Sequence, residues 1–394
     1  MSTQVLSHGL GNVLGSVRDR QARLGKNMPR ADRVLWVGII LLMALGTVMV
    51  LSSSVMIAER RFGEAGYFWK KQLLWSVLAI IVMAIVSRID YRLLRKWILP
   101  GALVSIILLI AVLFTEPVND AKRWLNLGLF KLQPAEVFRV VALMFAAALV
   151  AKRADDMDRP WRLWPLGLLL IIGTVLFMLQ PEFSGVMTMY LTIGIILLAG
   201  GLRWRHILPA VALIAIVGSV TVFGFEYKKT RINEWYEGFV TDTGGSYQVR
   251  QSKVALGSGG PFGEGLGRGR AKMLYLPEPH TDFVLATIGE ELGLVGFTAV
   301  VALATLLILR SWRVATRAPD RFGYLLVIGI GGALFVNAGL NAGVVTGLVP
   351  ATGLPFPFVS YGGSSLLTTA AAWGIVLNVS RYRTPRSARL VGSG

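Results

Sequence analysis

The stretch VLWVGIILLMALGTVMVLSSSVM, residues 34–56, decides the fold, because it contains no charged side chain. A helix needs about 20 apolar residues to cross roughly 30 Å of hydrocarbon, and this run is long enough. In lipid every backbone N–H and C=O group must find its partner inside the protein, which favours a helix. The stretch therefore predicts a transmembrane helix.

Further apolar runs of similar length follow, and the chain as a whole has 54% hydrophobic and only 16% charged residues. Soluble domains carry roughly 25% charged residues. A transmembrane barrel would show alternating segments of about ten residues, which this sequence lacks. We predict an all-α polytopic membrane protein with ten transmembrane helices at 34–56, 72–87, 97–115, 135–151, 164–180, 183–202, 206–225, 283–309, 322–345 and 361–380.

The distribution of Lys and Arg predicts the orientation, because cytoplasmic loops are enriched in both residues. The segments on the side of the termini contain 24 of them and the opposite segments 15, so both termini are predicted to be cytoplasmic. The predicted organisation is a cytoplasmic tail (1–33), a membrane domain (34–380) with one long periplasmic loop (226–282), and a second cytoplasmic tail (381–394). The polar residues before the first run argue against a cleavable signal peptide.

The net charge of +18 raises the alternative of nucleic-acid binding. Basic cytoplasmic loops facing anionic lipid headgroups explain this charge, so we expect membrane lipids and no nucleic acid as partners. The chain has no Cys, which excludes disulfides, thiolate metal sites and Cys nucleophiles.

Two irregular stretches interrupt the apolar pattern. The first, ALGSGGPFGEGLGRGR at 255–270, lies in the long loop and fits neither common nucleotide-binding glycine motif. Its backbone N–H groups could approach a phosphate closely, or it could be a flexible turn over a helix end. The second, GLVPATGLPFPFVSYGGSS at 347–365, holds prolines that interrupt a helix. We interpret it as a re-entrant loop lining a site, with an ordinary short periplasmic loop as the alternative.

Ionisable residues near or inside the spans are functional candidates, because a charge in the bilayer is unfavourable. Glu136 and Arg139 are three residues apart on one helix face and can form an ion pair. Glu182 lies in a tight turn, where solvation among lipid headgroups would explain it. Glu290 follows Asp282 by eight residues and is expected to share its helix face.

The stretch LPEPHTDF at 276–283 places Asp282 at the start of an apolar run, where an Asp is often an N-cap. The nearby Glu290, glycine-rich stretch and proline-rich stretch favour a chemical role instead. A carboxylate there can accept a proton from an attacking hydroxyl or hold a divalent cation beside a pyrophosphate. Asp282 is thus also the candidate metal ligand, with magnesium or manganese as the expected cation.

Seven short motifs together resemble the SEDS family of peptidoglycan glycosyltransferases, which includes FtsW, RodA and sporulation relatives. They are AKRWLNLG (121–128), QPAE (133–136), GSYQVRQS (245–252), GSGGPFGEGLG (257–267), LPEPHTDF (276–283), GEELG (289–293) and PFVSYGGSS (357–365). The proline-rich sequence and the basic N-terminal tail are more similar to those of the division branch, FtsW, than to those of RodA. The family usually has Asp where this chain has Glu182.

The resemblance implies a ten-helix enzyme that polymerises lipid II at the outer face of the inner (cytoplasmic) membrane. It implies that Asp282 is the catalytic residue and activates the acceptor 4-hydroxyl, while polyprenyl pyrophosphate leaves with the help of a divalent cation. The candidate substrate-binding residues are Lys122, Arg123, Glu136, Arg139, Arg231, Gln248, Lys272, His280, Glu290, Ser360, Tyr361 and Ser364.

The resemblance also implies partners: lipid II, the nascent glycan strand, a single-span class B penicillin-binding transpeptidase and, for the division branch at the septum, other divisome proteins. Two rival functions remain, a lipid II transporter and a non-catalytic divisome scaffold. A transporter usually contains internal repeats. This sequence shows none, and its polar residues gather at the outer face, which favours chemistry there.

Overall fold

The computed structural model describes residues 31–117, 121–128, 130–203, 205–206, 226–241, 246–270, 272 and 276–382, and for a few residues of 226–239 the backbone alone. Regular structure in this part of the chain is helical, except for a hairpin of β1 (Leu125–Asn126) and β2 (Lys131–Leu132). The α-helices are α2 (Arg33–Phe62), α3 (Tyr67–Val86), α4 (Leu94–Ala111), α5 (Pro134–Lys152), α6 (Trp164–Leu179), α7 (Phe183–Ala199), α9 (Glu226–Val240), α10 (Tyr247–Gly259), α11 (Val284–Ala315), α12 (Arg321–Val345) and α13 (Gly363–Arg381).

The predicted spans match these helices closely. Seven helical segments in the described residues are long and apolar enough to cross a membrane, and α7 is a shorter apolar helix. The predicted last span coincides with α13, although α13 is not among those seven. The predicted seventh span, 206–225, lies outside the described residues except for His206, as do most of the two tails. The all-α polytopic membrane fold is confirmed, and the count of ten spans stays a prediction.

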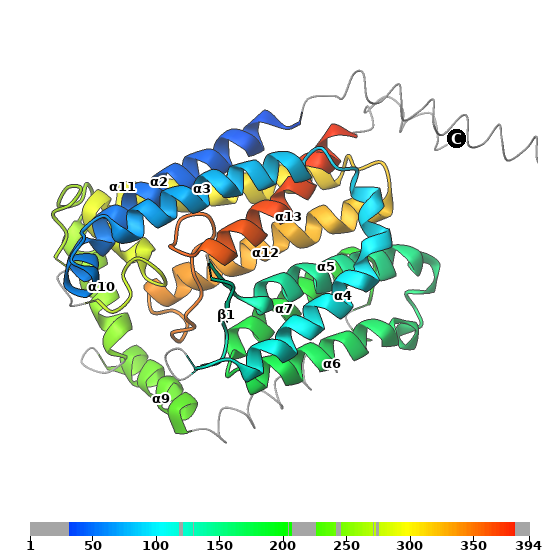
Figure 1. The fold of residues 1–394 in the computed structure, drawn as a ribbon, viewed down its shortest axis with the longest axis horizontal. Helices are drawn as coiled ribbons and strands as arrows, with labels where there is room; N and C mark the ends of the chain where they lie inside the picture. The colour runs from blue at the N-terminus through cyan, green and yellow to red at the C-terminus, as the bar shows by residue number, and fades with distance from the viewer. Residues whose placement is uncertain are drawn as a thin grey trace, which may run out of the picture.

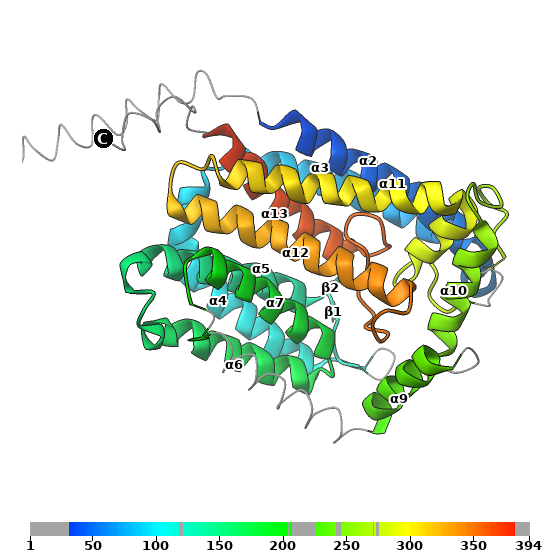
Figure 2. The same ribbon diagram turned by 180° about the vertical axis from the view of Figure 1, so that it is seen from behind.

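The helices form two groups joined by a central pair (Figures 1 and 2). Helices α2, α3 and α11 pack along one side, and α4, α5, α6 and α7 form the other side. Between them lie α12 and α13: α13 packs on α3, and α12 packs on α11, α5 and α7. Because α12 and α13 contact both groups, a cavity beside them is enclosed by helices far apart in sequence.

The long loop contains two helices that the sequence analysis did not predict, α9 and α10. Both dock on the end of α12: Trp235 Nε1 donates to Gly347 O at 3.2 Å, and Ser252 Oγ donates to Val345 O at 2.8 Å. In Figure 1 the helices α9 and α10 lie at the end of the bundle where α11 begins. The described parts of the loop are therefore ordered against the bundle, as its aromatic residues suggested.

The proline loop, which we define as residues 347–362, folds into the bundle. Phe356, Phe358 and Val359 are at most 2% exposed. The loop backbone approaches α2 so closely that a Cβ on Gly46 would lie 2.5 Å from Val359 O. Burial of this non-helical segment favours the re-entrant interpretation over an ordinary surface loop, because lipid does not tolerate unpaired backbone groups.

Candidate functional site

Asp282 lies where the start of α11 meets the proline loop and α12. The N-cap position of α11 is Phe283, so Asp282 precedes the cap and is not the N-cap residue. A Cβ on Gly353 would lie 3.5 Å from Asp282 Oδ2. The side-chain amide of Asn341 donates to Asp282 O at 2.8 Å and to Leu354 O at 2.7 Å. Asn341 therefore joins the aspartate backbone to the proline loop.

A second contact fixes the same stretch to the proline loop. Tyr361 N donates to His280 O at 2.9 Å, and the His280 ring packs against Phe68 and Tyr361, with centroid distances of 4.6 and 5.6 Å. His280 is only 3% exposed, so it is buried between these rings rather than solvated. Within the same loop, Phe356 N donates to Ser360 Oγ at 2.8 Å. Candidate residues from two distant motifs thus form one structural unit.

The burial of His280 predicts a pH effect on stability. Burial, together with the charge of Arg61, lowers the pKa of His280 from 6.5 to about 4. Between these values the unfolded chain binds a proton that the folded chain excludes. The contribution to stability is therefore complete above pH 6.5 and is lost as the pH falls toward 4, by up to roughly 3 kcal/mol. Thermal unfolding in detergent should show a steeper acid loss for the wild type than for His280→Gln. Equal pH slopes would contradict the burial.

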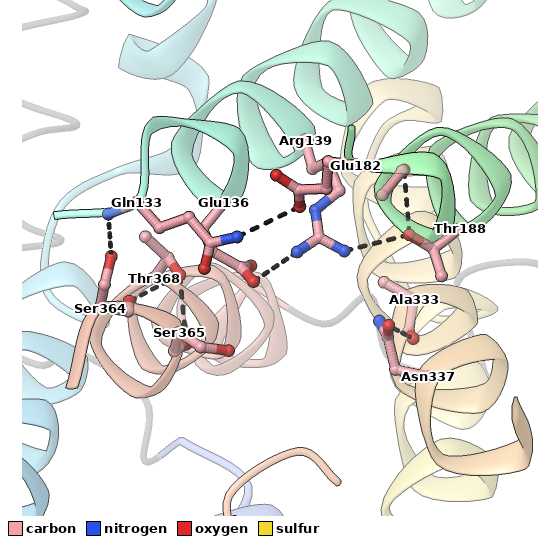
Figure 3. A network of polar contacts seen from close by, with 11 residues as sticks. Gln133, Glu136, Arg139, Glu182, Thr188, Ala333, Asn337, Ser364, Ser365 and Thr368 are labelled. Atoms are coloured by element: carbon pink, nitrogen blue, oxygen red, sulfur yellow. Dashed lines mark hydrogen bonds and ion pairs between the residues drawn. The ribbon is translucent and has the colours of Figure 1, made fainter. Parts of the chain in front are cut away.

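A cavity of about 80 Å³ lies deeper in the bundle, enclosed by α5, α7, α12 and α13. One wall is polar and the rest is largely apolar, with Pro357 of the proline loop also contributing. On the polar wall Glu136 and Arg139 form the predicted ion pair, and Arg139 Nη1 donates to Thr188 Oγ1 at 3.0 Å (Figure 3). The pair neutralises two charges that would otherwise be isolated in a mostly apolar space.

Glu182 extends this network. Gln133 Nε2 donates to Glu182 Oε1 at 3.2 Å, while Gln133 N donates to Ser364 Oγ at 3.1 Å (Figure 3). Glu182 is 5% exposed, so its interpretation as a headgroup-solvated carboxylate is wrong. Burial raises the pKa of Glu182, and the nearby Arg139 opposes this rise. Burial acts in this direction because it disfavours the charged form of a carboxyl group.

The cavity and Asp282 are connected along one face of α12. Asn337 lines the cavity, and Asn341, which holds the Asp282 backbone, follows it four residues later. Residues four apart lie on the same helix face, roughly 6 Å from one another. Asp282 does not itself line the cavity, so the site has two parts: an aspartate near the end of the bundle and a polar-walled cavity about one helical turn deeper.

Comparisons with known proteins show which family the chain belongs to. The model of the cell cycle protein family FtsW/RodA/SpoVE matches residues 32–385. The chain belongs to this family. A relative from Trichlorobacter lovleyi, named probable peptidoglycan glycosyltransferase FtsW, is 39% identical, covering 89% of this chain and 93% of the relative. Stage V sporulation protein E of Bacillus subtilis is 34% identical, covering 89% and 97%.

Solved structures of the family have the same fold. A chain from a peptidoglycan synthase complex, described as coordinating polymerization and crosslinking, superposes with a TM-score of 0.74 at 26% identity, covering 90% of this chain and 99% of that one. The rod shape determining protein RodA of Thermus thermophilus gives a TM-score of 0.68 at 27% identity, covering 90% and 98%.

Two predicted site residues of this family member, Lys122 and Arg123, bind backbone carbonyls elsewhere in the chain. Lys122 Nζ donates to Leu113 O at 3.1 Å, and Arg123 binds the carbonyls of Gln180 and Pro181 at 3.0 and 2.6 Å. Gln248 is the second residue of α10. The side chain of Arg231 lies outside the described residues.

The glycine loop, which we define as residues 260–270, is neither a vacant phosphate cradle nor a flexible turn. Its N–H groups are bound by the protein: Glu264 N donates to Glu290 O and Gly265 N to Glu291 O, both at 3.0 Å, and Arg270 N donates to the Glu290 carboxylate at 2.6 Å. Glu290 therefore faces the glycine loop, whereas Asp282 faces the proline loop. The shared helix face of Asp282 and Glu290 stays a prediction.

Asp282 is also the predicted ligand of a divalent cation. The described residues contain no group of three or more His, Asp or Glu side chains arranged to hold a metal ion. Magnesium commonly binds one or two protein carboxylates together with substrate phosphates. Asp282 fits only an arrangement in which substrate phosphates supply the other ligands. The described residues of the chain therefore do not form a metal site by themselves.

The roles of three residues of the site were not predicted from the sequence: Asn341, Asn337 and Gln133. The two Asn residues could have indicated a polar site, because two amide side chains four residues apart inside an apolar span are unusual. Gln133 belongs to a motif that was recognised, but its contact with Glu182 joins residues 49 positions apart. Such a pair becomes evident only in the folded chain.

The presence of Glu182 is linked to a glycine one turn later. A Cβ on Gly185 would lie 2.9 Å from Glu182 Oε1. We expect Gly185→Ala to lower the free energy of unfolding by roughly 1–3 kcal/mol, because it overpacks a buried site. In a Glu182→Asp background the same change should be nearly neutral, because the shorter side chain leaves room. Unfolding of the two single variants and the double variant in detergent measures the coupling, and purely additive losses would contradict it.

Proposed function

We propose that this chain is a peptidoglycan glycosyltransferase that polymerises lipid II at the outer face of the inner membrane. Its family membership and its FtsW-named relatives support this activity. The observation that carries the assignment to a site is the position of Asp282, half-buried at the end of the bundle and held by Asn341 against the proline loop. Lipid II has sugars in water and a polyprenyl tail in lipid, so its reacting bond lies at such a boundary.

In the proposed reaction Asp282 accepts the proton of the 4-hydroxyl of the acceptor N-acetylglucosamine. The oxygen forms a bond to the anomeric carbon of N-acetylmuramic acid on the growing strand. The bond from that carbon to the phosphate oxygen breaks, and polyprenyl pyrophosphate leaves with the electron pair. A positioned general base of this kind contributes about 10²- to 10⁴-fold to a rate.

We further propose that Asp282, together with the pyrophosphate of the substrate, would hold a divalent cation, which would supply charge neutralisation at the leaving group. Glu136 and Arg139 of the cavity wall, together with Ser364, which accepts from Gln133 N, are proposed to bind polar parts of a substrate. His280, Ser360 and Tyr361 are proposed to shape the surroundings of Asp282.

A class B penicillin-binding transpeptidase is the proposed partner, because a similar structure comes from a synthase complex that couples polymerization to crosslinking. The similarity to FtsW-named relatives supports a place among divisome proteins at the septum. The proposed domain organisation remains the one predicted from the sequence, with the membrane domain at 34–380 between two cytoplasmic tails.

The decisive experiment supplies purified lipid II to the purified chain, alone and with the class B transpeptidase of the same organism. Glycan strands resolved on a gel would support the enzyme. Loss of the strands on EDTA treatment, with recovery on addition of magnesium or manganese, would support its cation. Strands that form equally in EDTA contradict the cation alone. No strands with the partner present, together with lipid II movement across liposome membranes, favour the transporter. Neither activity, in a chain that still supports division, favours the scaffold.

A further inference from the structure

Helix α11 is broken near its start. Gly293 has φ 69° and ψ −169°, values that no α-helix contains. The break separates a buried first segment, 284–292, from the longer second segment, and it leaves backbone groups on both sides without helical partners. Asp282 lies two residues before the first segment. Because that segment is roughly 13 Å long, a small tilt at the break displaces the carboxylate.

The glycine loop binds the backbone groups that the break releases. The carbonyls of Glu290 and Glu291 accept from the loop, and Leu294 N and Val295 N donate to Gly260 O and Pro261 O at 2.9 and 3.2 Å. A Cβ on Gly263 would lie 2.2 Å from Glu291 O, so only glycine permits this approach. The loop therefore fixes the angle between the two segments of α11.

A buried ion pair holds the glycine loop in place. Lys272 Nζ lies 2.8 Å from Glu291 Oε1, and these side chains are 9% and 0% exposed. Glu291 Oε2 also accepts from Gly267 N at 3.0 Å, and Ser52 Oγ of α2 donates to both carboxylate oxygens at 2.7 and 2.6 Å. The pair thus ties three elements together at the break: α2, the glycine loop and α11.

We propose that the Lys272–Glu291 pair is a positioning device, which locks the glycine loop over the break at Gly293 and thereby holds the segment that presents Asp282. This inference rests on the proposed function. It assigns Lys272 a role inside the protein, in place of the substrate-binding role expected from the sequence. A misplacement of about 1 Å at a catalytic group can reduce a rate about 100-fold, so the pair acts on turnover through geometry.

The chain offers a matched control. A second partly buried ion pair, Arg310 Nε to Asp32 Oδ2 at 2.9 Å, ties α11 to α2 near the other end of both helices. It joins the same two elements, but it lies on the far side of the break from Asp282. A general loss of helix packing affects both pairs alike, whereas loss of positioning affects the Lys272 pair only.

The test measures lipid II polymerisation by the full-length chain with its transpeptidase, for wild type, Lys272→Met, Glu291→Gln, the double variant and Arg310→Met, with thermal unfolding of each. We expect Lys272→Met to lower kcat at least tenfold with KM within twofold of wild type. The double variant should be no slower than the slower single variant, because the two residues act as a unit. Arg310→Met should lower the melting temperature while kcat stays near the wild-type value.

Two results would overturn the inference. A rise in KM without a fall in kcat for Lys272→Met assigns Lys272 to substrate binding. A fall in kcat that tracks the melting temperature equally in Lys272→Met and Arg310→Met assigns the pair to general stability. An inactive wild type would instead refute the proposed function, so the two failures are distinguishable.

Discussion

Asp282→Asn abolishes strand synthesis, with an expected loss of about 1,000-fold or more in the polymerisation rate of lipid II. The amide keeps the shape of the side chain but cannot take the proton of the attacking hydroxyl. The fold should persist, because Asn341 binds the backbone carbonyl of Asp282, which the substitution leaves in place. Gel analysis of glycan strands gives the rate, and thermal unfolding in detergent verifies the fold.

A control and a graded variant sharpen this prediction. Glu278, four residues earlier, has a side chain that is 46% exposed, and Glu278→Gln should retain activity within a few-fold. Asp282→Glu keeps a carboxylate but displaces it by one methylene, so we expect an intermediate loss of about 10- to 100-fold. Full strand synthesis by Asp282→Asn would refute the assignment of this residue as the base.

Arg139→Met destabilises the protein by about 3–5 kcal/mol, the second large effect that we expect. Arg139 and Glu136 are only 14% and 13% exposed, and the buried Glu182 lies close to both. Removal of the cation leaves two carboxyl groups together in a space that excludes water. The free energy of unfolding in detergent should fall accordingly, and activity should fall with it.

The double variant Glu136→Gln/Arg139→Met separates the ion pair from its packing. The double variant also removes the Glu136 carboxylate, which the single variant leaves without its cation. It should therefore recover more than half of the stability that the single variant loses. The exposed pair of Lys70 and Glu64, with side chains 66% and 45% exposed, is the control, and Lys70→Met should change stability by less than about 1 kcal/mol. Equal losses for Arg139→Met and Lys70→Met would show that the cavity wall is solvated.

The sequence predicted the helices well because lipid restricts the alternatives. An uncharged apolar run has only one stable backbone form in hydrocarbon, so the run 34–56 corresponds to α2 and the run 322–345 to α12. Prolines likewise indicated an irregular segment at 347–365, of which residues 347–362 precede α13. Glu136 and Arg139, three residues apart, indicated their ion pair. These features are local, and local spacing determines them.

Features that depend on contacts between distant segments were not predictable in this way. Glu182 was predicted to be a solvated carboxylate, whereas elements elsewhere in the chain bury it, and the burial of His280 was not predicted at all. From the sequence, the glycine-rich stretch could be either a phosphate-binding segment or a flexible turn. In the structure it binds the backbone groups on both sides of the break in α11.

By itself, the sequence determined an all-helical membrane protein of the FtsW/RodA/SpoVE family with a carboxylate at a helix start. Only the tertiary structure decided the surroundings of that residue: Asn341 binds its backbone carbonyl, the proline loop lies beside its carboxylate, and Lys272 and Glu291 form an ion pair near the break in the helix that follows. The physical reason is that periodicity and burial in lipid depend on neighbours along the chain. A catalytic geometry depends instead on side chains that folding brings together from more than 200 positions apart, as Ser52 and Glu291 are.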